Sequence, residues 1–391
     1  MQIRKNVKMI VITLPALGLV CAMFAGGACV SSRPHPARLA TQAPAPDASK
    51  RSPATKPAAP TTNKSVKAKM VAEEEASLPG WDDFAHDHSL RCMSKTDERS
   101  QPELRLIAGQ KFRIEGSLLS LETAVQYPVR IGIVSAIKDS EDDTLANLDK
   151  AFAEFKKAGV QLVIANGDLS LQQFDLEDVM NKLGDSGLPV FVLIGNSESR
   201  SAFNRAFLKA EAKHRNLFNL NWNRHVSYGP LDFVSLPGYY DGHFLGQNSG
   251  CQYRPRDVED LLNLCSELQT HNRRIVLISH GPPRSRGRSA IDYAFEAGNV
   301  GDPAMTNMIE DYAIGLGLFG HILEAGGRGC QDLRTGKVAV ASKDYAKLYV
   351  NAGSASATPW GMHNGKESHG LAMIVVVDAK GAQYRVVKLR K

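Results

Sequence analysis

Four polar side chains stand directly after apolar runs that have the composition of buried strands. They are Asp168, Asn196, His280 and His321. In an open α/β sheet, ligands bind at the carboxyl ends of the strands, so we expect these side chains to share one crevice. A carboxylate, an amide oxygen and two imidazoles form a mixed donor set that suits Zn, Mn or Fe. Taken singly, each histidine is more typical of a hydrogen-bonded core, but the four together predict a metal site.

The elements that must position these residues alternate along the chain. Short apolar runs predict strands over 129–136, 161–168 and 188–196, and residues at helical spacing predict helices over 144–160, 174–187 and 199–214. The second half adds a helix over 255–271, a strand over 273–283, a helix running into a strand over 303–321, and β-rich segments to residue 389. This alternation predicts right-handed crossovers and a two-layer or four-layer α/β sandwich.

The polar blocks at the strand ends resemble the five ordered motifs of the calcineurin-like metallophosphoesterases. In that family the blocks are Asp-x-His, Gly-Asp, Gly-Asn-His, a lone His and Gly-His-x-His. Here they are AIK, GD, GNS, H and GHIL, and the resemblance covers roughly residues 128–390, including NAGS near the end. It implies an α/β fold, the family's four-layer α/β sandwich, in which two divalent cations activate a water that attacks a phosphoester.

Carried over residue by residue, the resemblance keeps one metal position. Asp168 corresponds to the carboxylate that bridges both cations, and Asn196, His280 and His321 correspond to the remaining ligands of one cation. The same resemblance places Asp168, Asn196 and His280 in the catalytic machinery. We expect one divalent metal ion (Zn, Mn or Fe), held weakly because the set carries a single formal negative charge.

The second metal position is expected to be absent. Ala136, Lys138 and Leu323 stand where the family has ligands, and Ser197 replaces the histidine that assists the leaving group. Alanine and leucine cannot bind a metal, and lysine would first have to lose a proton whose ordinary pKa is about 10.4. One hypothesis is that the ammonium of Lys138 replaces the lost cation by pairing with Asp168. The alternative is that Lys138 points to solvent.

Several other residues are candidates for the same crevice. Substitute ligands could come from Glu198 or from a loop that carries His363 and His369, although each is more typical of a surface group. Arg284 and Arg286, in the stretch PPRSRGRS, could clamp an anionic substrate bidentately. A solvated run of charge is the alternative for these arginines.

The N-terminus has the pattern of a secretory signal. Residues 1–28 contain a basic start, an apolar stretch and small residues before Cys29. This resembles a bacterial lipoprotein signal and implies lipidation at Cys29. Cleavage after Ala28 and retention as a membrane anchor are the alternatives. We expect an exported cell-envelope lipoprotein, in the outer membrane or facing the periplasm.

Composition divides the rest of the chain. Residues 29–75 are rich in Pro, Ala and Lys and predict a disordered tether. Residues 76–127 are expected as a lead-in, and residues 128–391 as the metallophosphoesterase-like domain. Residues 1–70 carry a charge of +10 against a total of +6, so the remainder carries −4. This balance does not indicate a nucleic-acid partner.

Four cysteines remain after the signal and Cys29. In an exported protein they permit two disulfides in three pairings, and buried free thiols are the alternative. They are Cys92, Cys251, Cys265 and Cys330.

Two functions fit these observations. The first is a metal-dependent phosphoesterase, a hydrolase acting on phosphoester bonds, impaired because it works with one metal. Its substrate would be a phosphoester-containing small molecule or a phospholipid. The second is a catalytically inactive envelope protein that uses the same fold for binding or as a scaffold.

Overall fold

The computed structural model describes residues 92–246 and 249–390. The predicted signal (1–28), the tether (29–75) and Cys29 lie outside the described residues. Within the described part, no helix is long and apolar enough to cross a membrane.

The first of two large sheets has six strands, in the order β20-β19-β4-β5-β6-β7. Four of them are parallel: β4 (Val129–Val134), β5 (Leu162–Asn166), β6 (Val190–Leu193) and β7 (Leu217–Asn219). The antiparallel strands β19 (Leu371–Val377) and β20 (Ala382–Lys388) complete the sheet. The C-terminal hairpin therefore pairs with the first strand of the predicted domain.

The second sheet has ten strands, in the order β1-β2-β3-β8-β9-β10-β13-β16-β14-β15. Its parallel centre contains β9 (Leu231–Leu236), β10 (Arg274–Ser279), β13 (Leu316–Phe319) and β16 (Leu348–Asn351). Beside this centre lie β8 (His225–Tyr228), β14 (Arg328–Asp332) and β15 (Lys337–Ala339). Parallel strands place their carboxyl ends at one edge of the sheet, as the site requires.

Residues 103–121 of the segment expected as a lead-in belong to this second sheet. They form β1 (Glu103–Ile107), β2 (Gln110–Glu115) and β3 (Leu118–Leu121), an antiparallel meander that pairs with β8 through β3. Phe112 and Leu119 point into the core between the sheets, which is the physical reason that the meander folds there. The folded domain therefore begins before residue 128.

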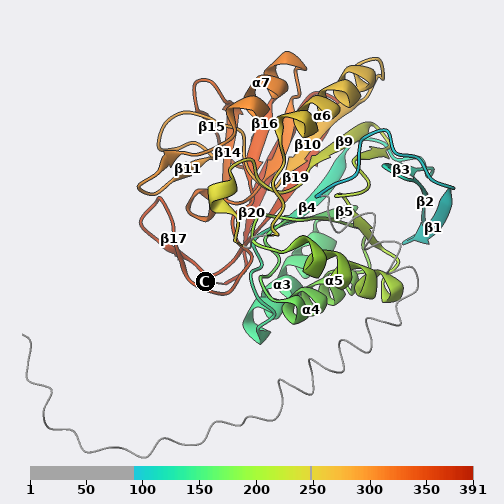
Figure 1. Ribbon diagram of the computed structural model, residues 1–391. Coiled ribbons are helices and arrows are strands. Elements are labelled where there is room, and N and C mark those ends of the chain that lie inside the picture. The colour runs from blue at the N-terminus through green and yellow to red at the C-terminus, as the bar shows by residue number, and fades with distance from the viewer. Residues whose placement is uncertain (1–91, 247–248, 391) are drawn as a thin grey trace, which may run out of the picture. The chain divides into compact units, whose positions relative to one another are not determined.

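The helices cover the outer faces of the two sheets (Figure 1). On the six-stranded sheet lie α3 (Asp142–Lys157), α4 (Gln173–Gly184) and α5 (Arg200–Lys213), and on the ten-stranded sheet lie α6 (Pro255–Leu268) and α7 (Pro303–Asp311). The loops between the strands and helices contain six short elements. They are η1 (Gly242–Phe244), η2 (Leu323–Ala325), β11 (Tyr293–Ala294), β12 (Gly298–Asn299), β17 (Trp360–Gly361) and β18 (Glu367–Ser368).

The side chains of each central strand alternate between two hydrophobic cores. On β5, Ile164 lies in the core between the sheets, and Val163 lies under the helices. On β10, Ile278 and Leu277 divide in the same way. This alternation follows from the period of two in a strand, and it gives the order helices, sheet, sheet, helices. The predicted four-layer α/β sandwich is confirmed.

The four cysteines of the described domain are all free thiols. Cys251, Cys265 and Cys330 are buried, and Cys92 is partly exposed. The expected disulfides are therefore not formed in the structure. The alternative expectation, free thiols, describes these four residues.

Candidate metal site

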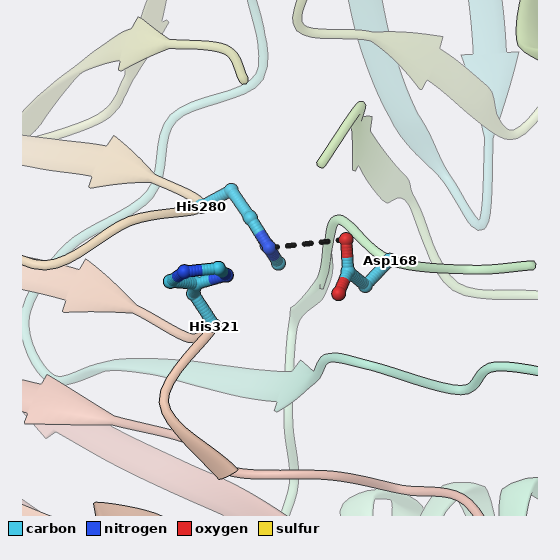
Figure 2. A group of neighbouring side chains, drawn as sticks. All are labelled: Asp168, His280 and His321. Carbon is cyan, nitrogen blue, oxygen red and sulfur yellow. Dashed lines mark ion pairs between the residues drawn. The ribbon is translucent and has the colours of Figure 1, made fainter. Parts of the chain in front are cut away.

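The structure brings the four predicted ligands together at the carboxyl ends of their strands. His280 Nε2 lies 2.9 Å from Asn196 Oδ1 and 3.2 Å from Asp168 Oδ1. The rings of His280 and His321 are 5.1 Å apart, centroid to centroid. One ligand atom from each of Asp168, His280 and His321 lies within 4.8 Å of the others. Figure 2 shows these three side chains together, with a dashed line for the ion pair between His280 and Asp168.

Backbone conformation aims two of these side chains. Asp168 and His321 have φ values of 56° and 66°, in the left-handed region that ordinary residues rarely adopt. Gly167 also has a positive φ, and a Cβ on it would lie 2.5 Å from His280 Nδ1. Only glycine therefore allows the turn after β5 to approach the His280 ring so closely.

Both ring nitrogens of His280 face oxygen atoms. Its Nδ1 lies 2.9 Å from the carbonyl oxygen of Asn166 and donates to it. Its Nε2 then faces two oxygens, on Asp168 and Asn196, and neither of them has a proton to give. Burial would lower the pKa of His280, but the Asp168 carboxylate outweighs it and raises the pKa. The nitrogen and the two oxygens are also the kinds of donor atom that bind a divalent cation.

The protonation states of Asp168 and His321 also suit the binding of a cation. Burial would raise the pKa of Asp168, yet His280 and Lys138 hold it well below its usual range, so the carboxylate is ionised. Burial and the neighbouring His280 lower the pKa of His321 to about 3, so its imidazole is neutral. A neutral imidazole and an ionised carboxylate are the forms that bind metal ions.

Lys138 pairs with Asp168 and does not point to solvent. Its Nζ contacts Asp168 Oδ2, while Asp168 Oδ1 faces His280. Lys138 has a φ of 75°, and its backbone N–H donates to the Asp168 carbonyl oxygen over 3.2 Å. The side chain is one-third exposed, at 33%. The ammonium thus lies on one carboxylate oxygen, and the candidate ligand set lies on the other.

The remaining residues of the predicted second position offer no ligand. Ala136 is buried with a φ of 47°, and Leu323 begins η2 with an aliphatic side chain. Ser197 donates its backbone N–H to Asp168 Oδ1 over 3.1 Å. Among the described residues, Lys138 therefore supplies the cationic partner of Asp168 on this side.

Glu198 is fully buried and is not the surface group expected from the sequence. Its carboxylate accepts hydrogen bonds from the backbone N–H groups of Leu169 and Gly195, the second over 3.1 Å. These bonds support the turns that present Asp168 and Asn196. Burial, and after it the charge of Asp168, raises the pKa of Glu198 to about 7.

The other predicted residues have partners elsewhere. His363 Nε2 lies 2.6 Å from the Tyr293 carbonyl oxygen, and His369 lies near Glu367. Arg284 donates to the Gly301 carbonyl oxygen over 2.9 Å. Arg284 and Arg286 line a cavity of about 440 Å³ whose lining includes none of the candidate ligands. The structure does not bring these groups to the metal site, so the predicted arginine clamp is not formed there.

Three residues that the sequence did not single out support the site. Asn166, at the end of β5, donates from Nδ2 to the carbonyl oxygens of Ser279 and Leu318, over 3.0 and 3.3 Å. It thereby joins the six-stranded sheet to β10 and β13 of the other sheet. The only available signal was its place in the stretch IANGD, directly before the predicted ligand.

The other two supporting residues come from the segment after β9. The Phe244 carbonyl oxygen accepts from Asn196 Nδ2 over 2.5 Å, which leaves Asn196 Oδ1 facing His280. The ring of Tyr239 lies 4.1 Å from the His321 ring, between centroids. No sequence pattern distinguished either residue, because both act through their position in the folded chain.

In metal-free protein, Glu198 should make stability fall as pH rises. Between its ordinary pKa of 4.5 and its folded pKa of about 7, the unfolded chain has released a proton that the folded chain still holds. Rising pH therefore favours unfolding. Glu198→Gln cannot ionise and should remove roughly 2–3 kcal/mol of this pH dependence. Denaturant unfolding of EDTA-treated protein across this interval measures it, and parallel curves for wild type and variant would contradict it.

No family model matches the sequence, and no curated protein shows significant similarity to it. Among solved structures, the chain is similar to a protein from Thermus thermophilus, with 15% identity, a TM-score of 0.44, and coverage of 67% of this chain and 100% of that one. It is also similar to a dimetal phosphatase from Danio rerio (13%, TM-score 0.43, 67% and 99%). A purple acid phosphatase from yellow lupin seeds is similar at 11%, with a TM-score of 0.45 and coverage of 72% and 57%.

Proposed function

We propose that the domain binds one divalent cation through Asp168, Asn196, His280 and His321, and hydrolyses phosphoesters with that ion. The observation that carries this proposal is the position of His280 Nε2, 2.9 and 3.2 Å from two oxygens that cannot donate a proton. A cation satisfies all three atoms at once. Zn, Mn or Fe fits this mixture of nitrogen and oxygen donors.

The residues around the ion have separate roles in this proposal. A bound cation would lower the pKa of a coordinated water and so supply a nucleophile. Asp168 directs Oδ1 to the ligand set and Oδ2 to Lys138 Nζ. Lys138 would hold a fixed positive charge where the resemblance places the second cation, and could neutralise a phosphate oxygen. One charge in place of two predicts slow turnover.

A second candidate function is binding without catalysis on the same fold. It is favoured by Ser197, which stands in place of the assisting histidine and uses its backbone N–H on Asp168. Without an acid at this position, a leaving group would depart unprotonated. In that case a phosphoester would be held at the ion and not cleaved.

For the place of action, we propose the cell envelope. The signal-like residues 1–28, Cys29 and the predicted tether support an exported lipoprotein whose substrate is a phosphoester-containing small molecule or a phospholipid. Mass spectrometry of the N-terminal peptide from a membrane fraction tests the anchor. A peptide that contains Cys29 without a lipid would contradict it.

Ion binding and turnover should saturate together at one ion per chain. The test titrates Mn²⁺ into chelator-treated full-length protein and follows both calorimetric binding and hydrolysis of an aryl phosphodiester. Two tightly bound ions would contradict the single position. One ion without turnover would decide for the binding protein.

Changing Lys138 should move ion binding and substrate binding in opposite directions. Lys138→Met removes a positive charge beside Asp168, so Mn²⁺ should bind roughly tenfold more tightly, while KM for an anionic phosphodiester should rise by a similar factor. Lys138→Arg keeps the charge and is the matched control. If both parameters stay unchanged in Lys138→Met, the ammonium does not take the place of a cation.

A further inference from the structure

Two cysteines from distant parts of the sequence meet beside a basic cavity. Cys92 lines a cavity of about 400 Å³, and this lining includes none of the candidate metal ligands. The charged residues of its lining are Lys95, Arg200, Arg254 and Arg256 against Asp257 and Asp260, so positive charge is in excess there. Cys251 is completely buried, directly before a residue that lines the same cavity.

The two thiols are in contact with each other. A hydrogen bond with Cys251 lowers the pKa of Cys92, whereas burial and, after it, the same interaction raise the pKa of Cys251. Cys92 Sγ also lies 3.6 Å from the carbonyl oxygen of Gln252, the residue after Cys251. The Cys92 thiol therefore lies against the segment that carries Cys251.

Both segments are fixed by hydrogen bonds. Two residues after Cys92, the Ser94 backbone N–H donates to the Asn221 carbonyl oxygen over 2.9 Å, and Ser94 Oγ donates to the Trp222 carbonyl oxygen. On the other side, Tyr239 donates its N–H to the Cys251 carbonyl oxygen over 3.1 Å. The thiols are thus held together by the fold and do not meet by chance.

We propose that Cys92 and Cys251 are a redox-active pair that forms a disulfide when the protein meets a disulfide oxidant such as oxidised glutathione. The bond would join the beginning of the described domain to the segment that pairs with Tyr239. Since the Tyr239 ring packs against the His321 ring, the same bond would steady one wall of the candidate metal site.

The chemistry of the pair suits thiol–disulfide exchange. The hydrogen bond from Cys251, and to a smaller extent the charge of Arg200, lowers the pKa of Cys92, which makes Cys92 the nucleophile. Its thiolate attacks one sulfur of glutathione disulfide, the glutathione S–S bond breaks, and one glutathione thiolate leaves. The Cys251 sulfur then gives up its proton and attacks Cys92, releasing the second glutathione. Two protein thiols are oxidised, one disulfide is reduced, and the two protons pass to the two glutathione thiolates.

The other two thiols of the described domain are not placed for this reaction. Burial raises the pKa of Cys265 to about 12. Cys330 Sγ lies 3.0 Å from the Asp332 carbonyl oxygen and 3.9 Å from Ser285 Oγ, and burial raises its pKa also. Oxidation should therefore select Cys92 and Cys251.

The test compares full-length protein treated with oxidised glutathione or with dithiothreitol. After blocking of free thiols and digestion, mass spectrometry of the oxidised sample should find one peptide pair joined through Cys92 and Cys251. Because this bond closes a very long loop, the oxidised protein should melt roughly 5–10 °C above the reduced one. Cys92→Ser should abolish both the joined peptides and this difference.

Cys265→Ala is the matched control, since it removes a buried thiol without touching the pair, and its redox-dependent shift should persist. Wild-type mapping is decisive even if a variant does not fold. The proposal is overturned if Cys92 and Cys251 are each recovered separately blocked after oxidation, if Cys92 carries only glutathione, or if either joins a different cysteine.

Discussion

Asp168→Asn should weaken divalent cation binding by at least roughly a hundredfold. Asp168 supplies the only carboxylate among the four candidate ligands, and the amide that replaces it has the same shape without the charge. The Ser197 N–H already donates to Oδ1, so the new amide group would face Lys138 Nζ, donor against donor. Calorimetric titration of Mn²⁺ into chelator-treated protein measures the loss.

The matched control for this change is Asp139→Asn. Asp139 lies one residue after Lys138, and its carboxylate accepts from Ser356 Oγ over 3.2 Å and from the Glu141 N–H over 3.1 Å. It carries the same charge as Asp168, lies on the loop after β4 and is outside the ligand set, so its loss should leave the affinity within about twofold. Equal Mn²⁺ affinity in wild type and Asp168→Asn would show that the four side chains do not form a metal site.

Restoring the second position should create a two-ion enzyme. The variant carries Ala136→Asp, Lys138→His, Ser197→His and Leu323→His together. We expect two bound ions per chain and phosphodiester turnover that rises roughly a hundredfold or more, because a second cation and an acid for the leaving group are both supplied. Metal analysis and a steady-state assay of the aryl phosphodiester measure the two effects.

The backbone is already prepared for these substitutions. Ala136 and Lys138 have φ values of 47° and 75°, a region in which aspartate and histidine are found several times more often than most residues. The four substitutions together with Asp168→Asn form the control, which should keep the fold and lose both ions. A folded restored variant with one ion, or with wild-type turnover, would refute the idea that the second position was lost by substitution alone.

The sequence predicted the strand tips well because their signals are local. An apolar run, a glycine and a polar residue describe a strand and the turn after it, and this was enough to place Asp168, Asn196 and His321 at one edge. The alternation of strands and helices in the first half likewise predicted β4, β5 and β6, three of the parallel strands of the six-stranded sheet. It did not predict β7 or the place of β19 and β20 in that sheet.

What the sequence did not predict depends on how the two sheets meet. Glutamate is a residue type typical of the surface. Glu198 is buried because the turns that contain Leu169 and Gly195 bond to its carboxylate. Asn166 bonds to strands more than a hundred residues away, and no local pattern specifies that partner. The strands of residues 103–121 were missed because they are short and because exposed Leu104 and Leu106 obscure the alternation. In each case tertiary contacts decide the outcome.

The bonds from Asn166 connect metal affinity to the integrity of the whole sandwich. Its side-chain amide ties the ends of β5, β10 and β13 together, and its carbonyl oxygen accepts from His280. The layers therefore cannot separate at this edge without also displacing His280, one of the candidate ligands. Opening of the domain and release of a bound ion would therefore occur together. Amide hydrogens at the ends of β5, β10 and β13 should exchange as a single cooperative unit, and their exchange should become slower when the ion is added.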